Sequence, residues 1–191
     1  MEKVTQVTQV TKNSLNRFPP KKLRSFATLY FLFLLAGLFV FFIAYGMGYR
    51  INLSQSTPRG LWRIQEGAEL ARGSYVTVSP KGNPGYDLAL ERGYFRENSF
   101  MLKKIVAMEG DYVDYDVEER AITVNGDYIL LTEILSQDTE GLPMQPAAFP
   151  VHIGERQAWL SSEFIRGYDS RYFGPVPSEL LKKANPIWIF R

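Results

Sequence analysis

Two separate segments of the chain carry residue types that cleave acyl bonds. Residues 54–60 read Ser-Gln-Ser-Thr-Pro-Arg-Gly, and residues 102–111 contain the adjacent Lys103 and Lys104. A serine hydroxyl is a weak nucleophile until a base takes its proton, and an uncharged lysine amine can act as that base. We therefore interpret Ser56 as a candidate nucleophile that is activated by a lysine of the later segment.

The composition narrows the choice of base. The 191 residues include no cysteine, which excludes thiolate nucleophiles, disulfides and sulfur-ligated zinc. The one histidine, His152, would have to serve in any Ser-His-Asp triad, and a metal site would lack the usual imidazole ligands. We interpret His152 as a structural or surface residue, and we expect neither a metal nor another cofactor.

The serine segment has residues typical of a loop, and it contains two serines that are two positions apart. Pro58 fixes its own φ and favours extended backbone at Thr57, while Gly60 permits a turn. Residues two apart in an extended segment project to the same side, so Ser54 and Ser56 would share a face. One hydroxyl could then attack while the other, with the Ser56 backbone N–H, donates hydrogen bonds to the oxyanion. An ordinary hydrated loop has the same residue types.

A lysine can serve as the base only when it is uncharged. A free lysine has a pKa of about 10.4, so roughly one in a thousand is neutral near pH 7, and burial among apolar groups lowers that pKa. Lys103 lies within an apolar run, 100–108, that predicts a buried strand, and strand alternation places Lys104 on the opposite face. The alternative is that both lysines lie on an edge strand and protect it from aggregation. This alternative explains Lys104 well and leaves the role of Lys103 undetermined.

A third candidate segment, residues 167–177, reads Gly-Tyr-Asp-Ser-Arg-Tyr-Phe-Gly-Pro-Val-Pro. Asp169 and Arg171 can pair and brace a loop beside the reacting groups. A solvated ion pair near a turn is an equally good interpretation of the two residues.

A membrane anchor would position the serine segment. Residues 25–49 carry no charge and exceed the roughly 20 residues that a helix needs to cross a hydrocarbon core. A soluble core helix would show a polar face, and a cleavable signal peptide has an apolar region of only about 7–15 residues. We therefore predict a basic tail at 1–24, a transmembrane anchor at 25–49 and a peptidase domain at 50–191. Ser56 lies only 6 residues beyond Arg50, a reach of about 20 Å that keeps it near the bilayer.

Charge gives the expected orientation and argues against a nucleic-acid partner. The first 24 residues hold 6 of the 22 basic residues and 1 of the 20 acidic residues, which leaves 16 basic against 19 acidic, a net charge of −3, for the remainder. Lysine and arginine are enriched on cytoplasmic flanks of membrane segments, so the tail should be cytoplasmic and the domain periplasmic. No basic stripe marks the domain as a nucleic-acid surface.

The rest of the pattern predicts a mainly β, antiparallel domain behind the anchor. Asn125-Gly126 is the strongest hairpin signal, and residues 137–150 are typical of a long surface loop. Strands are predicted at 75–79, 100–108, 112–117, 121–124, 127–131, 157–160 and 187–190. Short helices are predicted at 86–92 and 178–183, and a loop at 83–85.

Together the three segments resemble the type I signal peptidase family, which uses a Ser-Lys dyad, and in particular its conjugative-transfer branch, the TraF-type peptidases. Residues 56–61, Ser-Thr-Pro-Arg-Gly-Leu, look like the serine box of that branch and are preceded by Ile51-Asn52. Residues 103–111 are similar to its lysine box, and residues 169–177 to its C-terminal box. Each box alone is a weak signal, whereas three in order behind one anchor are fairly specific.

The resemblance implies a signal-peptidase-like antiparallel β-domain and assigns roles to five residues. Ser56 would be the nucleophile and Lys103 the general base. Ser54 would be a second oxyanion donor, and Asp169 and Arg171 would support the site.

Two departures from the family pattern bear on this assignment. Met108-Glu109 stands where the family more often has an apolar residue and proline before Gly-Asp, which concerns the rigidity of a turn. The general branch also has a Gly-Asp-Asn motif and a serine two residues before the aspartate, whereas here the region reads Ser161-Ser162-Glu163 and then Gly167. The sequence therefore leaves the group that orients the lysine unidentified and favours the conjugative branch.

The resulting expectation is a membrane-anchored serine endopeptidase of signal peptidase I type in a bacterial inner membrane. Its expected partners are the lipid bilayer, a membrane-bound precursor peptide or pilin, and components of a conjugation or secretion apparatus. The alternatives are a housekeeping-type signal peptidase and a non-catalytic anchored assembly protein. The sequence does not distinguish hydrolysis of the acyl-enzyme from transpeptidation or cyclisation.

Overall fold

A computed structural model describes residues 21–78, 85–94 and 99–190, and the chain divides into two compact units after Gly46. The first unit contains helix α2 (Lys21–Gly46). Its Ser25–Gly46 stretch has a mean hydropathy of 2.5 and is the one helix, among the described residues, that is long and apolar enough to cross a membrane. The helix ends at Gly46, and Tyr49 already belongs to the second unit.

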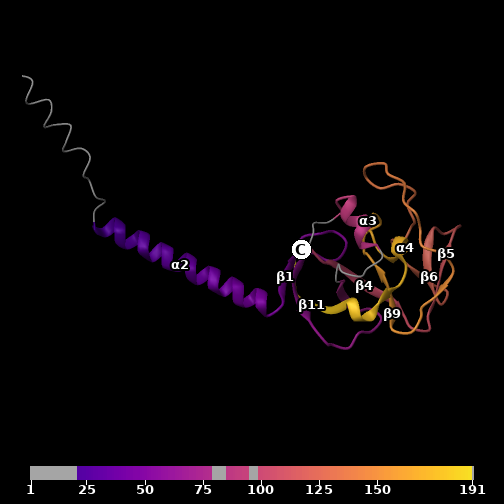
Figure 1. Cartoon of the computed structure of the whole chain (residues 1–191), viewed down its shortest axis with the longest axis horizontal. Coiled ribbons are helices and arrows are strands. Elements are labelled where there is room, and N and C mark those ends of the chain that lie inside the picture. The colour runs from indigo at the N-terminus through magenta and orange to yellow at the C-terminus, as the bar shows by residue number, and fades with distance from the viewer. Residues whose placement is uncertain (1–20, 79–84, 95–98, 191) are drawn as a thin grey trace, which may run out of the picture. The chain divides into compact units, whose positions relative to one another are not determined.

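The second unit consists of two antiparallel sheets, which confirms the predicted mainly β fold (Figure 1). The larger sheet has seven strands in the order β1 (Tyr49–Asn52), β2 (Gly60–Gln65), β11 (Leu181–Ile189), β3 (Tyr75–Val78), β4 (Met101–Met108), β9 (Gln157–Ser161) and β10 (Val176–Pro177). The smaller sheet has the order β7 (Asp127–Ile129), β6 (Ala121–Val124), β5 (Tyr112–Asp116) and β8 (Val151–His152). The helices of this unit are short: α3 (Tyr86–Glu91), α4 (Ser170–Phe173) and the 3₁₀ turn η1 (Ser178–Leu180).

Strand β4 lies between β3 and β9 and is buried on both faces. Ile105 packs into one apolar cluster with Val76 and Leu160, whereas the next residue, Val106, packs into a second cluster with Trp159. Burial on both sides explains why the strand is apolar at nearly every position. It also contradicts the edge-strand interpretation of the lysines, because both lysines lie in an interior strand.

Several local predictions are confirmed by the structure. The predicted strands at 100–108, 112–117 and 121–124 correspond to β4, β5 and β6. Asn125 and Gly126 join β6 to β7 with φ of 53° and 90°, the two positive values that a type I′ hairpin turn requires. The predicted helix at 86–92 is α3, and residues 137–150 contain no helix or strand. Residues 79, 83 and 84, which the predictions placed in a strand and a loop, lie outside the described residues.

Other local predictions are wrong. The helix predicted at 178–183 is limited to the η1 turn, because Leu181 begins strand β11, which pairs with both β2 and β3. Pairing on two sides outweighs the helical preference of a short polar segment. The strand predicted at 187–190 is confirmed as the end of β11, which stops at Ile189. Strands β1 and β2 were not predicted, since Tyr49 continues an apolar run and Gly60 disfavours a strand.

Candidate active site

The serine segment is a loop whose ends are held together by the pairing of β1 with β2. Asn52 lies opposite Gly60 in that ladder, and the chain bends around Ser56 between them. Gly60 was expected to permit a turn, but in the structure it is required by close packing. A Cβ at residue 60 would lie 2.2 Å from the backbone oxygen of Trp188 on β11. The loop is therefore fixed at its end by close packing of two strands.

The Asn52 side chain organises the inside of this loop. Its Nδ2 donates to the Thr57 carbonyl oxygen at 3.2 Å, to Thr57 Oγ1 at 3.1 Å and to the Pro58 carbonyl oxygen at 3.1 Å. Its Oδ1 accepts from the Ser54 backbone N–H at 3.1 Å and from Ser54 Oγ at 2.7 Å. Asn52 thus connects the residues on both sides of Ser56.

The structure brings the two predicted serines together. Ser54 Oγ and Ser56 Oγ are 3.0 Å apart. A serine hydroxyl has one proton, and that of Ser54 is directed to Asn52 Oδ1. In this arrangement the Ser56 hydroxyl donates to Ser54. Ser54 can donate to an oxyanion only after its proton leaves Asn52.

Lys103 is buried within β4, with 4% of its surface exposed. Its Nζ donates a hydrogen bond of 2.7 Å to Ser162 Oγ. Burial lowers the pKa of Lys103 to about 8; the Asp169 carboxylate opposes this effect and the Arg171 guanidinium adds to it. Lys104, on the other face, is partly exposed and pairs with Glu163. Of the two lysines, Lys103 is therefore the one with a buried amine, and burial makes that amine neutral more readily than a free lysine.

Ser162, the hydrogen-bond partner of Lys103, directly follows β9. Its backbone N–H donates to Asp169 Oδ2 at 2.8 Å. Gly167 packs against it so closely that a Cβ at Gly167 would lie 2.1 Å from Ser162 Oγ. A side chain any larger than hydrogen at 167 would thus displace the hydroxyl that contacts Lys103.

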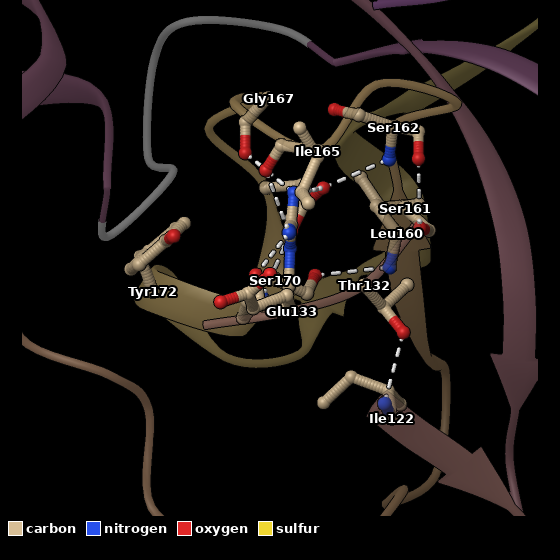
Figure 2. Close-up of polar contacts among 12 residues, drawn as sticks. Ile122, Thr132, Glu133, Leu160, Ser161, Ser162, Ile165, Gly167, Ser170 and Tyr172 are labelled. Atoms are coloured by element: carbon tan, nitrogen blue, oxygen red, sulfur yellow. Dashed lines mark hydrogen bonds and ion pairs between the residues drawn. The ribbon is translucent and has the colours of Figure 1, made fainter. Parts of the chain in front are cut away.

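Asp169 and Arg171 form a buried ion pair, which supports the bracing interpretation over a solvated pair. Arg171 Nε donates to Asp169 Oδ1 at 2.8 Å, and Nη2 donates to Asp169 Oδ2 at 2.9 Å. The remaining N–H groups of Arg171 donate to the backbone oxygens of Glu133, Ile165 and Gly167 (Figure 2). All five guanidinium donors are therefore matched, and one side chain links the segment at Glu133, the 163–169 turn and α4.

Ser54, Ser56 and Lys103 line one pocket of about 1020 Å³. No hydrogen bond joins Ser56 to Lys103 among the described residues; Ser56 contacts Ser54, and Lys103 contacts Ser162. The pocket is also lined by Tyr94 after α3, by Asp138 and Met144 of residues 137–150, by Tyr168, and by Tyr172 of α4. A volume of this size can hold several residues of an extended peptide beside the serine.

Two residues of the site, Ser162 and Asn52, were not identified from the sequence. Ser162 contacts a lysine 59 positions earlier, and that separation leaves no local pattern. The only signal was a pair of serines directly after the strand predicted at 157–160. Asn52 was noted only as part of the Ile51-Asn52 pair that precedes the serine box. His152 packs against Tyr112 on the smaller sheet and does not line the pocket.

Comparison with known proteins gives matches over most of the chain. The profile of the family described as signal peptidase, peptidase S26, matches residues 23–188. The conjugal transfer protein TraF of Agrobacterium fabrum (strain C58 / ATCC 33970) is 34% identical over 151 residues, which cover 75% of this chain and 84% of the relative. The probable conjugal transfer protein TraF of Sinorhizobium fredii (strain NBRC 101917 / NGR234) is 33% identical over 138 residues, covering 69% and 71%.

A solved structure also matches. The crystal structure of a signal peptidase I from Enterococcus faecalis V583 has a TM-score of 0.35 and 15% sequence identity to this chain. The match covers 65% of this chain and 98% of that structure.

Proposed function

This chain belongs to the signal peptidase family, peptidase S26, and on that basis we propose that it is a membrane-anchored serine endopeptidase of conjugal transfer. Ser56 is the nucleophile and Lys103 the general base. The observation that carries the proposal is the buried Lys103 amine, with its pKa lowered to about 8, lining the same pocket as Ser56. A buried lysine with a lowered pKa is the group that Ser-Lys catalysis requires.

The reaction follows from the protons and bonds at these atoms. Neutral Lys103 takes the Ser56 proton as Ser56 Oγ attacks the peptide carbonyl, and the resulting oxyanion accepts hydrogen bonds from the Ser56 backbone N–H and from Ser54 Oγ. When the C–N bond breaks, the Lys103 ammonium returns the proton to the leaving amine. Water then attacks the acyl-enzyme with Lys103 again as base, the ester bond to Ser56 Oγ breaks, and the Lys103 ammonium returns the proton to Ser56 Oγ. Before the attack, the Ser56 hydroxyl turns from Ser54 toward Lys103, and Lys103 keeps Ser162 as its partner.

The proposed substrate is a membrane-bound precursor, a conjugative pilin or a related transfer protein, cleaved at the periplasmic face of the inner membrane. The relatives named as conjugal transfer proteins support this choice over a housekeeping signal peptidase. The helix Ser25–Gly46 would be the anchor, with Lys21, Lys22 and Arg24 on its cytoplasmic side. The partners are then the precursor, the bilayer and the conjugation apparatus.

Product masses test the proposal. Each candidate pilin precursor is co-expressed with the wild type and with Ser56→Ala, and the products are weighed by mass spectrometry. We expect the wild type, and not Ser56→Ala, to shorten one precursor. A joined or cyclic product indicates transfer of the acyl group to an amine. A product heavier by one water than that joined form indicates hydrolysis. Identical masses with both variants for every precursor would instead support a non-catalytic assembly protein.

A further inference from the structure

Glu163 has a side chain held by two residues of neighbouring strands. Tyr75 Oη, on β3, donates to Glu163 Oε1 at 2.7 Å, and Lys104 Nζ, on β4, donates to the same oxygen at 3.2 Å. The Lys104 ammonium also lies 5.5 Å from the centre of the Tyr75 ring. Burial and the nearby Glu163 carboxylate raise the pKa of Tyr75, so the phenol keeps its proton and remains the donor. We name these three residues the Tyr75–Lys104–Glu163 cluster.

The backbone of Glu163 reaches the serine loop. Its N–H donates to the Ser56 carbonyl oxygen at 2.8 Å. The residue immediately before it, Ser162, accepts from Lys103 at 2.7 Å. Two consecutive residues therefore contact the proposed nucleophile segment and the proposed base, and a rotation of that short segment would change the separation of Ser56 from Lys103.

The cluster is poorly suited to a purely stabilising role. The Lys104 and Glu163 side chains are 37% and 35% exposed, and ion pairs with this exposure contribute little to the free energy of unfolding. Lys104 also lies in an interior strand, where it protects no sheet edge. Position matters far more in catalysis, where a displacement of about 1 Å can cost a factor of roughly 100 in rate.

We propose that the Tyr75–Lys104–Glu163 cluster is a positioning unit, which fixes the Glu163 backbone so that its N–H holds the Ser56 carbonyl and sets Ser56 at its distance from Lys103. This inference rests on the proposed function for its effect on rate. The structural part, that the side chain of residue 163 restrains the amide that contacts the serine loop, does not depend on any substrate.

Amide hydrogen exchange tests the structural part in the full-length protein in detergent. Relative to the wild type, Glu163→Ala should speed exchange of the residue-163 amide at least about 10-fold after correction for intrinsic rates, and should also speed exchange within 54–60. Glu66→Ala is the matched control, because Glu66 pairs with Lys182 of the same sheet without contacting the serine loop. Unchanged exchange at residue 163 in Glu163→Ala would overturn the inference.

Cleavage kinetics on the precursor that the wild type shortens test the rate part. Glu163→Ala should lower kcat at least about 10-fold with KM within about twofold, and should leave the acid limb of the pH profile in place. Glu163→Gln, which keeps an acceptor for Tyr75 and Lys104, should recover most of the rate. A fall in kcat that is explained by a smaller folded fraction would contradict a positioning role. A shift of the acidic limb of the pH profile would contradict it as well. If the wild type and Ser56→Ala both leave every precursor intact, the proposed function fails, while the exchange measurement still decides the inference.

Discussion

Lys103 Nζ donates a hydrogen bond of 2.7 Å to Ser162 Oγ in the buried interior of the domain. A hydrogen-bond partner fixes the direction of a buried amine, so this contact orients Lys103 Nζ. Ser162 is therefore our candidate for the orienting group that the sequence left open. It also links the proposed base to the Asp169–Arg171 pair, because the Ser162 backbone N–H donates to Asp169.

Replacing Ser162 should therefore reduce the rate and leave substrate binding intact. We expect Ser162→Ala to lower kcat by about 10-fold to 100-fold, with KM within about twofold, because the amine loses its direction but the pocket remains. Steady-state cleavage of the precursor measures this. Ser161→Ala is the matched control, since Ser161 is buried beside Ser162 but donates to the Ser162 carbonyl oxygen instead of contacting Lys103. Equal losses in the two variants would show that the contact with Lys103 is not what matters.

The pH dependence should follow the ionisation of Lys103. Its pKa is lowered to about 8, so the neutral base is the minor form below that pH, roughly one molecule in ten at pH 7. We expect kcat/KM to fall as the pH falls through about 8 and to level off above it. A profile of kcat/KM between pH 6 and pH 10 measures the limb, and a limb near the ordinary lysine value would show that the base is not a buried lysine.

Gly167→Ala should act through Ser162. A Cβ at 167 would lie 2.1 Å from Ser162 Oγ and 2.3 Å from Ser162 Cβ, so the serine must move away from its position beside Lys103. We expect activity no higher than in Ser162→Ala, together with a lower unfolding temperature. In Gly167→Ala/Ser162→Gly the clash with Ser162 is removed and a 2.9 Å approach to the Phe164 carbonyl oxygen remains, so the unfolding temperature should recover in part while the activity does not. Recovery of activity in that double variant would exclude a role for the Ser162 hydroxyl.

Asp169→Ala should destabilise the domain. It leaves the buried Arg171 guanidinium without its carboxylate, a change that typically costs about 3–5 kcal/mol. It also removes the acceptor of the Ser162 N–H. Thermal unfolding of the full-length protein in detergent should show a clearly lower midpoint. Glu66→Ala, which breaks an exposed ion pair, should leave the midpoint unchanged, and a similar shift in both variants would count against a special role of the buried pair.

The sequence revealed those parts of the fold and of the candidate site that lie within continuous patterns. Lys103 could be predicted as buried because the apolar run around it spans the whole of β4, and Asn125-Gly126 predicted its turn from local geometry alone. Ser162 could not be predicted, because its role depends on strand β9 lying beside β4 and on a turn that ends at Asp169. Strand β11 was also missed in part, because its pairing with β2 and β3 is decided far from Ser178, where the local residues favour a helical turn.

The most direct test compares cleavage of the precursor by Lys103→Met and Lys104→Met. Because a positioned general base contributes about 100-fold to 10,000-fold to the rate, Lys103→Met should lower kcat at least about 100-fold, without a lower unfolding temperature since it removes a buried amine. Lys104→Met should lower kcat no more than about 10-fold, through the positioning of Ser56. Retained cleavage in Lys103→Met, or loss confined to Lys104→Met, would contradict the assignment of Lys103 as the base for Ser56.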